Sequence, residues 1–536
     1  MHLDRDACYR ALLTRDARFD GQFFTAVRTT GIYCRPICPA RAPKLENVIF
    51  LPSAAAAQAA GFRPCLRCRP ETSPDIAAWR GTAATVTRAV ALIAAGALDE
   101  DRVDGLAARL GMGERQLRRL FRQHLGASPN AVAQTRRSLF AKQLITDTRL
   151  PLAEIALAAG FGSVRRFNDS FRKLYGRPPG TLRRGAGDAA GSAVTLMLPY
   201  KPPYDWPAMM GFLAARAIPG VEHVRPELYA RSIALGGAHG TIVVRPADPR
   251  GGPNTPARHA LVATIRFPVI TALPAIVARI RRIFDLGADP ALIGAQLSAE
   301  PHLAMLVAAR PGLRVPGAWD GFELAIRAIL GQQITVAAAT RLAGKLVAAY
   351  GAALPPDGPE APGLRYVFPP PDRLAGADLT STLGMPRARA AALAGMAAAA
   401  TADARLFEPG QGLEDAVARL VALPGIGDWT AQYIAMRALR EPEAVSPRMR
   451  ERIDAAVERL SYRRNLMAGG LASARSMTIG VVIPSMINAF FSNTLEGMES
   501  GLAGSGYQLL IGNSRYGLET EEQLVASLLA WSPAAI

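Results

Sequence analysis

Apolar residues recur at helical spacing along Glu114–His124. Leu117, Leu120 and Phe121 occupy positions i, i+3 and i+4, so they share one face of a helix. The remaining surface is largely basic and carries Arg115, Arg118, Arg119 and Arg122. The apolar run before this segment ends at Gly111, where a short turn is expected. The pattern predicts two short helices, the second with an exposed basic face.

The same arrangement returns further along the chain. The glycine-rich stretch Gly160–Ser163 is followed by Phe167, Phe171 and Tyr175, again at helical spacing. Arg165 and Arg166 lie off that apolar stripe, and Ser163 stands at the start of the helix. Two helix-turn-helix units are therefore expected within residues 82–184, each able to offer a basic helix to the major groove of DNA. The plainer alternative is a generic helical domain.

Beyond this region the pattern changes. Small residues at 185–193 predict a linker. The alanine-rich run Ala390–Thr401 contains a glycine and predicts a soluble helix, not a membrane span. The first residues, Met1–Asp6, are too charged for a secretory signal. We therefore expect a cytoplasmic protein with no membrane partner, and its 536 residues predict several domains.

The charge of the chain points to a polyanionic partner. The formal net charge is +18, and residues 1–186 hold 30 lysines and arginines against 15 acidic residues. Solvated basic helices would explain this excess without any partner. Together with the helix-turn-helix pattern, however, the excess favours double-stranded DNA.

Four of the five cysteines form two close pairs. Cys34 and Cys38 are separated by three residues, and Cys65 and Cys68 by two. In a cytoplasmic protein such pairs indicate metal ligands and not disulfides. Four thiolates suit tetrahedral Zn²⁺ in a closed site, and the alternative is four unrelated buried thiols. Cys8 lies outside the pattern and is expected to be a free thiol.

Cations and hydroxyls surround these pairs, where they can hold a phosphate near sulfur. The residues predicted to do so are Arg28, Thr30, Arg35, Arg63 and Arg67. The region from Ala7 to Pro70 resembles the N-terminal domain of the Ada adaptive-response regulators. In that family the first cysteine irreversibly accepts a methyl group from a DNA methylphosphotriester. The resemblance implies this catalytic role for Cys34.

The physical chemistry agrees with that role. Zinc keeps a thiol ionised at neutral pH, so a nucleophile is always present. A zinc centre with four thiolates is negatively charged, and methylation of one sulfur reduces that charge. Repulsion from DNA phosphates then falls, and the repair event becomes a signal.

Residues 82–184 resemble the DNA-binding domain of the AraC/XylS regulators, through Ile155–Phe161 and Phe167–Gly176. The order of the two domains is that of the Ada family. The resemblance implies promoter binding, activation of transcription and RNA polymerase as a partner. The DNA contacts expected from it are Arg115, Arg118, Arg119, Ser163, Arg165 and Arg166.

A third resemblance covers residues 194–444, to AlkA-type 3-methyladenine DNA glycosylase II. It rests on Tyr200–Trp206, Phe322–Gln333 and Leu423–Ala431. The last segment is typical of a helix-hairpin-helix, whose glycines let backbone N–H groups approach a phosphate. Gly425, Gly427 and Thr430 are the expected contacts.

Glycosylases of this kind extrude the damaged nucleotide and stack its base on aromatic rings. The resemblance places Phe212, Trp429 and Tyr433 in the base pocket. The family also needs an aspartate to stabilise the transition state, and Met449 occupies the position where it is expected. We therefore predict that glycosylase activity is impaired.

From residue 445 the chain resembles another family, the LacI/GalR repressors. Val445–Ile453 is similar to the last helix of their headpiece and Tyr462–Ala468 to their hinge. Thr478–Pro484 and Tyr507–Asn513 resemble the first two strands of their effector domain. Two βα units rarely form a stable sheet alone, so we expect a poorly packed fragment from a fusion or an artefact.

The sequence thus predicts a multidomain, mainly α protein. Its expected parts are a small α/β domain that binds zinc through four cysteines (1–75), an AraC-type double helix-turn-helix (82–184), a linker (185–193), an α+β AlkA N-terminal-like domain (194–312), an incomplete helix-hairpin-helix glycosylase domain (313–444) and a partial α/β periplasmic-binding-like fragment (445–536). The predicted function is repair of alkylated DNA and regulation of the adaptive response. A working 3-methyladenine glycosylase and a transcription factor without repair activity remain as alternatives.

Overall fold

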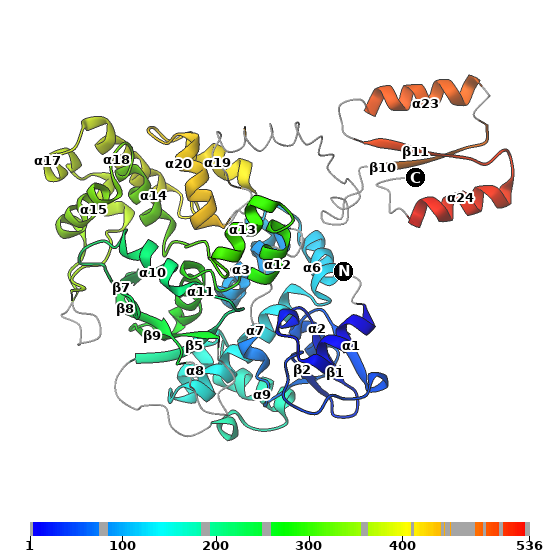
Figure 1. The fold of residues 1–536 in the computed structure, drawn as a ribbon, viewed down its shortest axis with the longest axis horizontal. Coiled ribbons are helices and arrows are strands. Elements are labelled where there is room, and N and C mark those ends of the chain that lie inside the picture. The colour runs from blue at the N-terminus through cyan, green and yellow to red at the C-terminus, as the bar shows by residue number, and fades with distance from the viewer. Residues whose placement is uncertain are drawn as a thin grey trace. The chain divides into compact units, whose positions relative to one another are not determined.

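The protein is described here by a computed structural model. It describes residues 4–73, 84–183, 193–248, 259–354, 363–408, 412–440, 444, 451, 478–485, 489–502 and 507–530. The chain divides into two compact units, residues 1–80 with 85–451, and residues 81–84 with 452–536 (Figure 1). The elements are mostly helices.

The first part of the chain, which we call the cysteine module, is built around a small four-stranded sheet. The strand order is β3-β1-β2-β4, with β2 and β4 parallel and the other pairs antiparallel. Its elements are α1 (Arg5–Thr14), η1 (Ala17–Phe19), β1 (Phe24–Val27), β2 (Ile32–Cys34), η2 (Leu45–Asn47), β3 (Val48–Leu51), α2 (Ala54–Ala59), β4 (Arg63–Pro64) and η3 (Pro70–Thr72).

The next part, the basic helical module, contains the two expected helix pairs. Helix α5 packs against α6 and α8 against α9, while the long helix α7 contacts both pairs. Its elements are α3 (Ala84–Ala94), α4 (Ala97–Glu100), α5 (Val103–Arg109), α6 (Glu114–Leu125), α7 (Pro129–Asp147), α8 (Leu152–Ala158), α9 (Val164–Tyr175) and η4 (Pro179–Leu182). Leu117 and Phe121 on α6, like Phe167 and Phe171 on α9, are fully buried, as their spacing predicts.

A five-stranded antiparallel sheet dominates the sheet module. The order is β5-β9-β8-β7-β6, and its core is continuous with that of α7, α8 and α9. Its elements are β5 (Ala193–Pro199), α10 (Trp206–Ala214), β6 (Glu222–Arg225), β7 (Leu228–Leu235), β8 (Ala238–Pro246), β9 (Ala260–Arg266), η5 (Ile270–Ala272), α11 (Leu273–Ile283), α12 (Pro290–Leu297) and α13 (Pro301–Ala309).

The helical module follows and completes the first unit. Helix α14 lies in the core of this module and is almost entirely buried. It contacts α15, α18 and α20. The elements are α14 (Gly321–Leu330), α15 (Val336–Tyr350), α16 (Pro371–Ala375), α17 (Leu379–Leu383), α18 (Arg387–Ala402), α19 (Leu413–Val421), α20 (Asp428–Ile434) and the π-helical turn η6 (Ala435–Leu439).

The second unit contains two parallel strands, β10 (Thr478–Ile483) and β11 (Gln508–Asn513), where the sequence predicts them. Helices α23 (Ala489–Leu502) and α24 (Leu518–Ala530) lie on opposite sides of this pair (Figure 1). The side chains of Phe490 and Leu518 are largely exposed. The predicted headpiece helix and hinge, 445–453 and 462–468, lie almost wholly outside the described residues.

Candidate metal centre and DNA-facing surfaces

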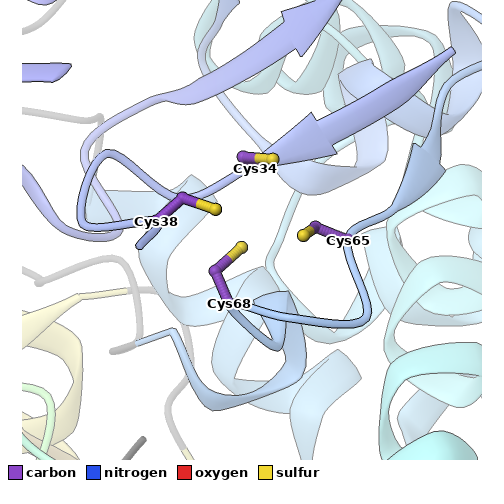
Figure 2. A group of neighbouring side chains, drawn as sticks. All are labelled: Cys34, Cys38, Cys65 and Cys68. Carbon is purple, nitrogen blue, oxygen red and sulfur yellow. The ribbon is translucent and has the colours of Figure 1, made fainter. Parts of the chain in front are cut away.

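Two neighbouring parallel strands bring the cysteine pairs together. Cys34 ends β2, and Cys65 directly follows β4, whose Pro64 pairs with Tyr33. The loops that follow these strands supply the second cysteine of each pair. The four sulfur atoms lie within 4.8 Å of one another, and Figure 2 shows the side chains converging on a common centre. Residues from two distant parts of the sequence thus form one compact group.

The chemistry of this group suits zinc. Four sulfur donors at this spacing match a closed structural zinc site. Hydrogen bonding to Cys38 is the largest of the effects that raise the pKa of Cys34. Four thiolates this close together repel one another, so a bound cation favours their ionised forms. Backbone N–H groups of Arg35 and Arg67 donate to the sulfurs of Cys68 and Cys65, each at 3.4 Å. Such donors commonly support zinc thiolates. The four cysteines therefore form the zinc site that the sequence predicts.

The four sulfur ligands differ in accessibility. Cys38, Cys65 and Cys68 are 3–8% exposed, whereas Cys34 is only partly buried. Cys8 lies outside the group, in a small core beside Ala11 and Phe23. Burial, followed by the charge of Asp4, raises the pKa of Cys8 to about 11. Cys34 is thus the most exposed of the four residues, and Cys8 is a protonated thiol at neutral pH.

The predicted phosphate-contacting residues around the zinc site are not all on the surface. Arg28, Thr30 and Arg67 are exposed, and Arg63 is half-buried. Arg35, in contrast, is 5% exposed and its guanidinium forms an ion pair with Asp20. The prediction that Arg35 contacts DNA is corrected accordingly, because its charge is already neutralised inside the module.

The basic helices present most of the predicted side chains to solvent. Arg115 and Arg119 on α6 are exposed, as are Arg165 and Arg166 on α9. Arg118 is less exposed, and its Nε donates to Glu114 at 2.7 Å. Exposed guanidinium groups of this kind are free to contact phosphates or base edges.

Ser163 has a structural role at the start of α9. Its hydroxyl accepts a hydrogen bond from the backbone N–H of Arg166 at 3.2 Å. This interaction is an N-cap, which satisfies one of the unpaired N–H groups of the first helical turn. The side chain remains exposed, so capping does not remove it from the surface that α9 presents.

The helix-hairpin-helix is formed by α19, the turn at Pro424–Gly427, and α20. Gly425 has a φ of +80°, and a Cβ there would lie 2.6 Å from the Cβ of Ala392. Gly427 precedes α20 with an ordinary φ and open space around it. Both glycines are exposed, so the backbone of the turn is accessible.

Thr430 lies behind that turn and not on it. It is 4% exposed, and Nε2 of Gln332 donates both to its hydroxyl at 3.4 Å and to the carbonyl of Gly425 at 2.9 Å. The predicted phosphate contact by Thr430 is therefore corrected to a role in supporting the hairpin from the end of α14.

The three predicted pocket aromatics do line one cavity. This cavity measures about 290 Å³ and lies between the sheet and helical modules, with Phe212, Trp429 and Tyr433 in its wall. Trp429 and Tyr433 stack with ring centroids 5.4 Å apart, and 57% of Trp429 is exposed. A flat, partly open aromatic surface of this type can stack against a nucleobase.

Sequence reasoning missed other residues of this wall. Trp319 precedes α14 and contributes a further aromatic ring. Arg437 lies 4.8 Å from the ring centroid of Phe212 and also donates to the hydroxyl of Tyr433. The spacing of Trp429, Tyr433 and Arg437 at four-residue steps is a signal that could have identified one shared helical face.

Two carboxylates, Glu222 and Glu323, also line the cavity, and both are held in ion pairs by arginines. Burial disfavours the charged form of Glu323, but Arg231 and Arg327 outweigh it and lower the pKa of this residue to about 2. The position at which the sequence lacks the expected aspartate, Met449, lies outside the described residues.

Comparison with known domain families identifies three parts of the chain. Residues 7–71 match the metal-binding domain of Ada. Residues 106–185 match a helix-turn-helix domain, and residues 195–320 match the AlkA N-terminal domain. The order agrees with the expected succession of parts. No helix among the described residues is long and apolar enough to cross a membrane.

Comparison with whole proteins finds relatives of the same kinds. A probable bifunctional transcriptional activator/DNA repair enzyme AlkA from Mycobacterium tuberculosis is 42% identical over 450 residues, 83% of this chain and 88% of that protein. DNA-3-methyladenine glycosylase 2 of Escherichia coli is 40% identical over 254 residues, 47% of this chain and 83% of that protein. The HTH-type transcriptional regulator GntR of Escherichia coli is 38% identical over 96 residues, 18% of this chain and 29% of that protein.

Proposed function

Because this chain belongs to the family of bifunctional transcriptional activator/DNA repair enzymes that join Ada-like and AlkA-like parts, we propose that Cys34 accepts a methyl group from DNA methylphosphotriesters. The observation that carries this proposal is the partial exposure of Cys34 among three buried cysteines. Only an accessible sulfur can meet a methyl group on a DNA backbone. We propose that the exposed side chains of Arg28 and Arg67 hold the neighbouring phosphates.

The reaction is a transfer between two atoms. Cys34, Cys38, Cys65 and Cys68 would hold the zinc, which would keep their sulfurs ionised as it does for other coordinating thiols. The thiolate of Cys34 forms a bond to the methyl carbon while the bond between that carbon and the phosphate oxygen breaks. The oxygen keeps the electron pair, so the DNA regains an ordinary phosphodiester. The product thioether is stable, and each chain therefore reacts once.

The product state explains how repair would regulate transcription. The modified centre carries one negative charge less, so it repels DNA phosphates less strongly. The exposed arginines of α6 and α9 then bind promoter DNA more tightly. As an activator the protein would work with RNA polymerase in the cytoplasm.

Methyl transfer can be tested directly on the full chain. A duplex with labelled methylphosphotriesters is incubated with the zinc-loaded protein, and peptide mass spectrometry locates the label. We expect a single labelled methyl group on Cys34, none in Cys34→Ser, and wild-type labelling in the matched control Cys8→Ser. Absence of label on a zinc-loaded wild-type protein would favour the alternative of a transcription factor without repair activity.

The aromatic cavity supports a second function, recognition of an alkylated base. We propose that Trp429 and Tyr433 stack an extruded base there, and that base release is slow because the expected acid is replaced by Met449. Trp429→Ala should weaken binding to alkylated duplex while leaving labelling of Cys34 intact. Release of 3-methyladenine with repeated turnover would instead support the alternative of a working glycosylase.

A further inference from the structure

Helix α7 has a row of polar side chains that are buried and not solvated. Thr135, Ser138 and Lys142 lie at i, i+3 and i+7 and are 2–6% exposed. Such a row on a helix that belongs to a DNA-binding module needs buried partners. The cysteine module supplies partners for Thr135 and Lys142, because α7 packs against both α2 and η3.

The strongest contact is a buried ion pair. Nζ of Lys142 lies 2.7 Å from a carboxylate oxygen of Glu71, and their side chains are only 2% and 1% exposed. Arg69, next to it in the cysteine module, pairs with Asp147 at 2.7 Å and donates to Thr146 at 2.9 Å. Arg69 directly follows Cys68 and Glu71 lies three residues after it, so the zinc-binding loop is tied to the last two turns of α7.

A second contact leads to the strand that ends at Cys34. The hydroxyl of Thr135 donates to Oε1 of Gln58 at 3.1 Å, and Nε2 of Gln58 donates to the hydroxyl of Tyr33 at 2.9 Å. Tyr33 is fully buried and directly precedes Cys34. A chain of hydrogen bonds therefore runs from α7 to the strand that carries the proposed methyl acceptor.

The two modules also fit closely at the end of α6. Ser53 donates to the carbonyl of Leu125 at 2.6 Å. Gly126 has a φ of +65°, and a Cβ on it would lie 3.1 Å from Ala56 and 3.2 Å from Pro52. Leu66, between two zinc ligands, packs against the core that contains Phe171 of α9. The contact surface thus reaches both helix-turn-helix units.

We propose that α7 makes the zinc-loaded cysteine module a structural part of the DNA-binding module. Loss of zinc frees the Cys65–Cys68 loop and with it Glu71, which leaves the ammonium of Lys142 buried without a partner. Removing one member of a buried pair is strongly destabilising. Loss of the metal therefore loosens α7 and α9 even when no DNA is present. This inference rests on the zinc site and not on the proposed methyl transfer.

Amide hydrogen exchange of the full chain tests the coupling without any DNA. Peptides from α7 and α9 are followed in zinc-loaded protein and after removal of zinc with a chelator. We expect exchange of α7 to become at least about tenfold faster without zinc, since local opening sets the exchange rate. Unchanged exchange in α7 and α9 would overturn the proposal, whatever the outcome of the methyl-transfer experiment.

Substitutions separate the coupling from a general loss of structure. In zinc-loaded Lys142→Met, the amides of α7 should exchange as fast as they do in the zinc-free wild type. In the surface control Lys44→Met, they should exchange as slowly as in the zinc-loaded wild type. The double variant Glu71→Leu with Lys142→Met should restore slow exchange, because apolar pairs often replace buried ion pairs without loss. Full protection of α7 in Lys142→Met would contradict the proposal. If Lys142→Met does not fold, Thr135→Val gives the same test with a smaller expected acceleration, and no acceleration in it would contradict the proposal.

Discussion

Arg35 donates its backbone N–H to the sulfur of Cys68 and, through its side chain, neutralises Asp20. Nε lies 2.8 Å from the Asp20 carboxylate, and both side chains are 6% exposed. Nη1 of the same guanidinium donates to the carbonyl of Cys68 at 3.2 Å. One buried arginine therefore joins the loop after Cys34 to the loop that carries Cys68, so it fixes two zinc ligands relative to each other.

Asp20→Ala should destabilise the cysteine module. The substitution removes the carboxylate that pairs with the buried Arg35 guanidinium, and breaking a buried ion pair typically costs ~3–5 kcal/mol. Chelator competition should then remove zinc at a lower concentration, and thermal unfolding should begin earlier. Glu46→Ala is the matched control, because its ion pair with Lys44 is exposed and contributes little. Equal zinc retention in the two variants would contradict the role given to Arg35.

Gly425→Ala should disturb the helix-hairpin-helix more than Gly427→Ala. Gly425 combines a positive φ with a close approach to Ala392, and a left-handed conformation costs a non-glycine residue about 1–3 kcal/mol. Gly427 has neither constraint, so its alanine variant should fold normally. Thermal unfolding measures the difference. If the two variants unfold at the same temperature, the turn tolerates a side chain at both positions.

The sequence predicted the features that depend on residues close together in the chain. The apolar faces of α6 and α9 follow from their helical spacing, and the paired cysteines form the group expected of them. Contacts between distant residues were not predictable in this way. Buried Arg35 pairs with Asp20, and buried Thr430 accepts a hydrogen bond from Gln332. Lys142 is buried and pairs with Glu71 of η3, a contact that no local sequence pattern indicates.

Arg115→Ala and Arg118→Ala should differ in their effect on DNA binding. Arg115 is exposed, whereas Arg118 is engaged by Glu114 on the same helix. Losing one phosphate contact lowers the slope of log K against log salt by about one. Titration of promoter DNA at several salt concentrations should show this decrease for Arg115→Ala and a smaller one for Arg118→Ala. The reverse order would place Arg118 at the phosphate backbone.

As the pH rises, Cys8 should react faster with alkylating agents, whereas its contribution to the stability of the fold should fall. Burial raises the pKa of this thiol from an ordinary value of 9 to about 11, so the folded chain favours the protonated form. Its contribution to stability is fully present below pH 9 and is lost as the pH rises toward 11. Its thiolate fraction instead increases about tenfold for each pH unit below 11, and alkylation of the folded protein by iodoacetamide should accelerate accordingly. Mass spectrometry of Cys8 peptides follows the rate, with Cys8→Ser as the control for stability. A plateau of the alkylation rate near pH 9 would mean that Cys8 is exposed in solution, and the core around Phe23 would then be open.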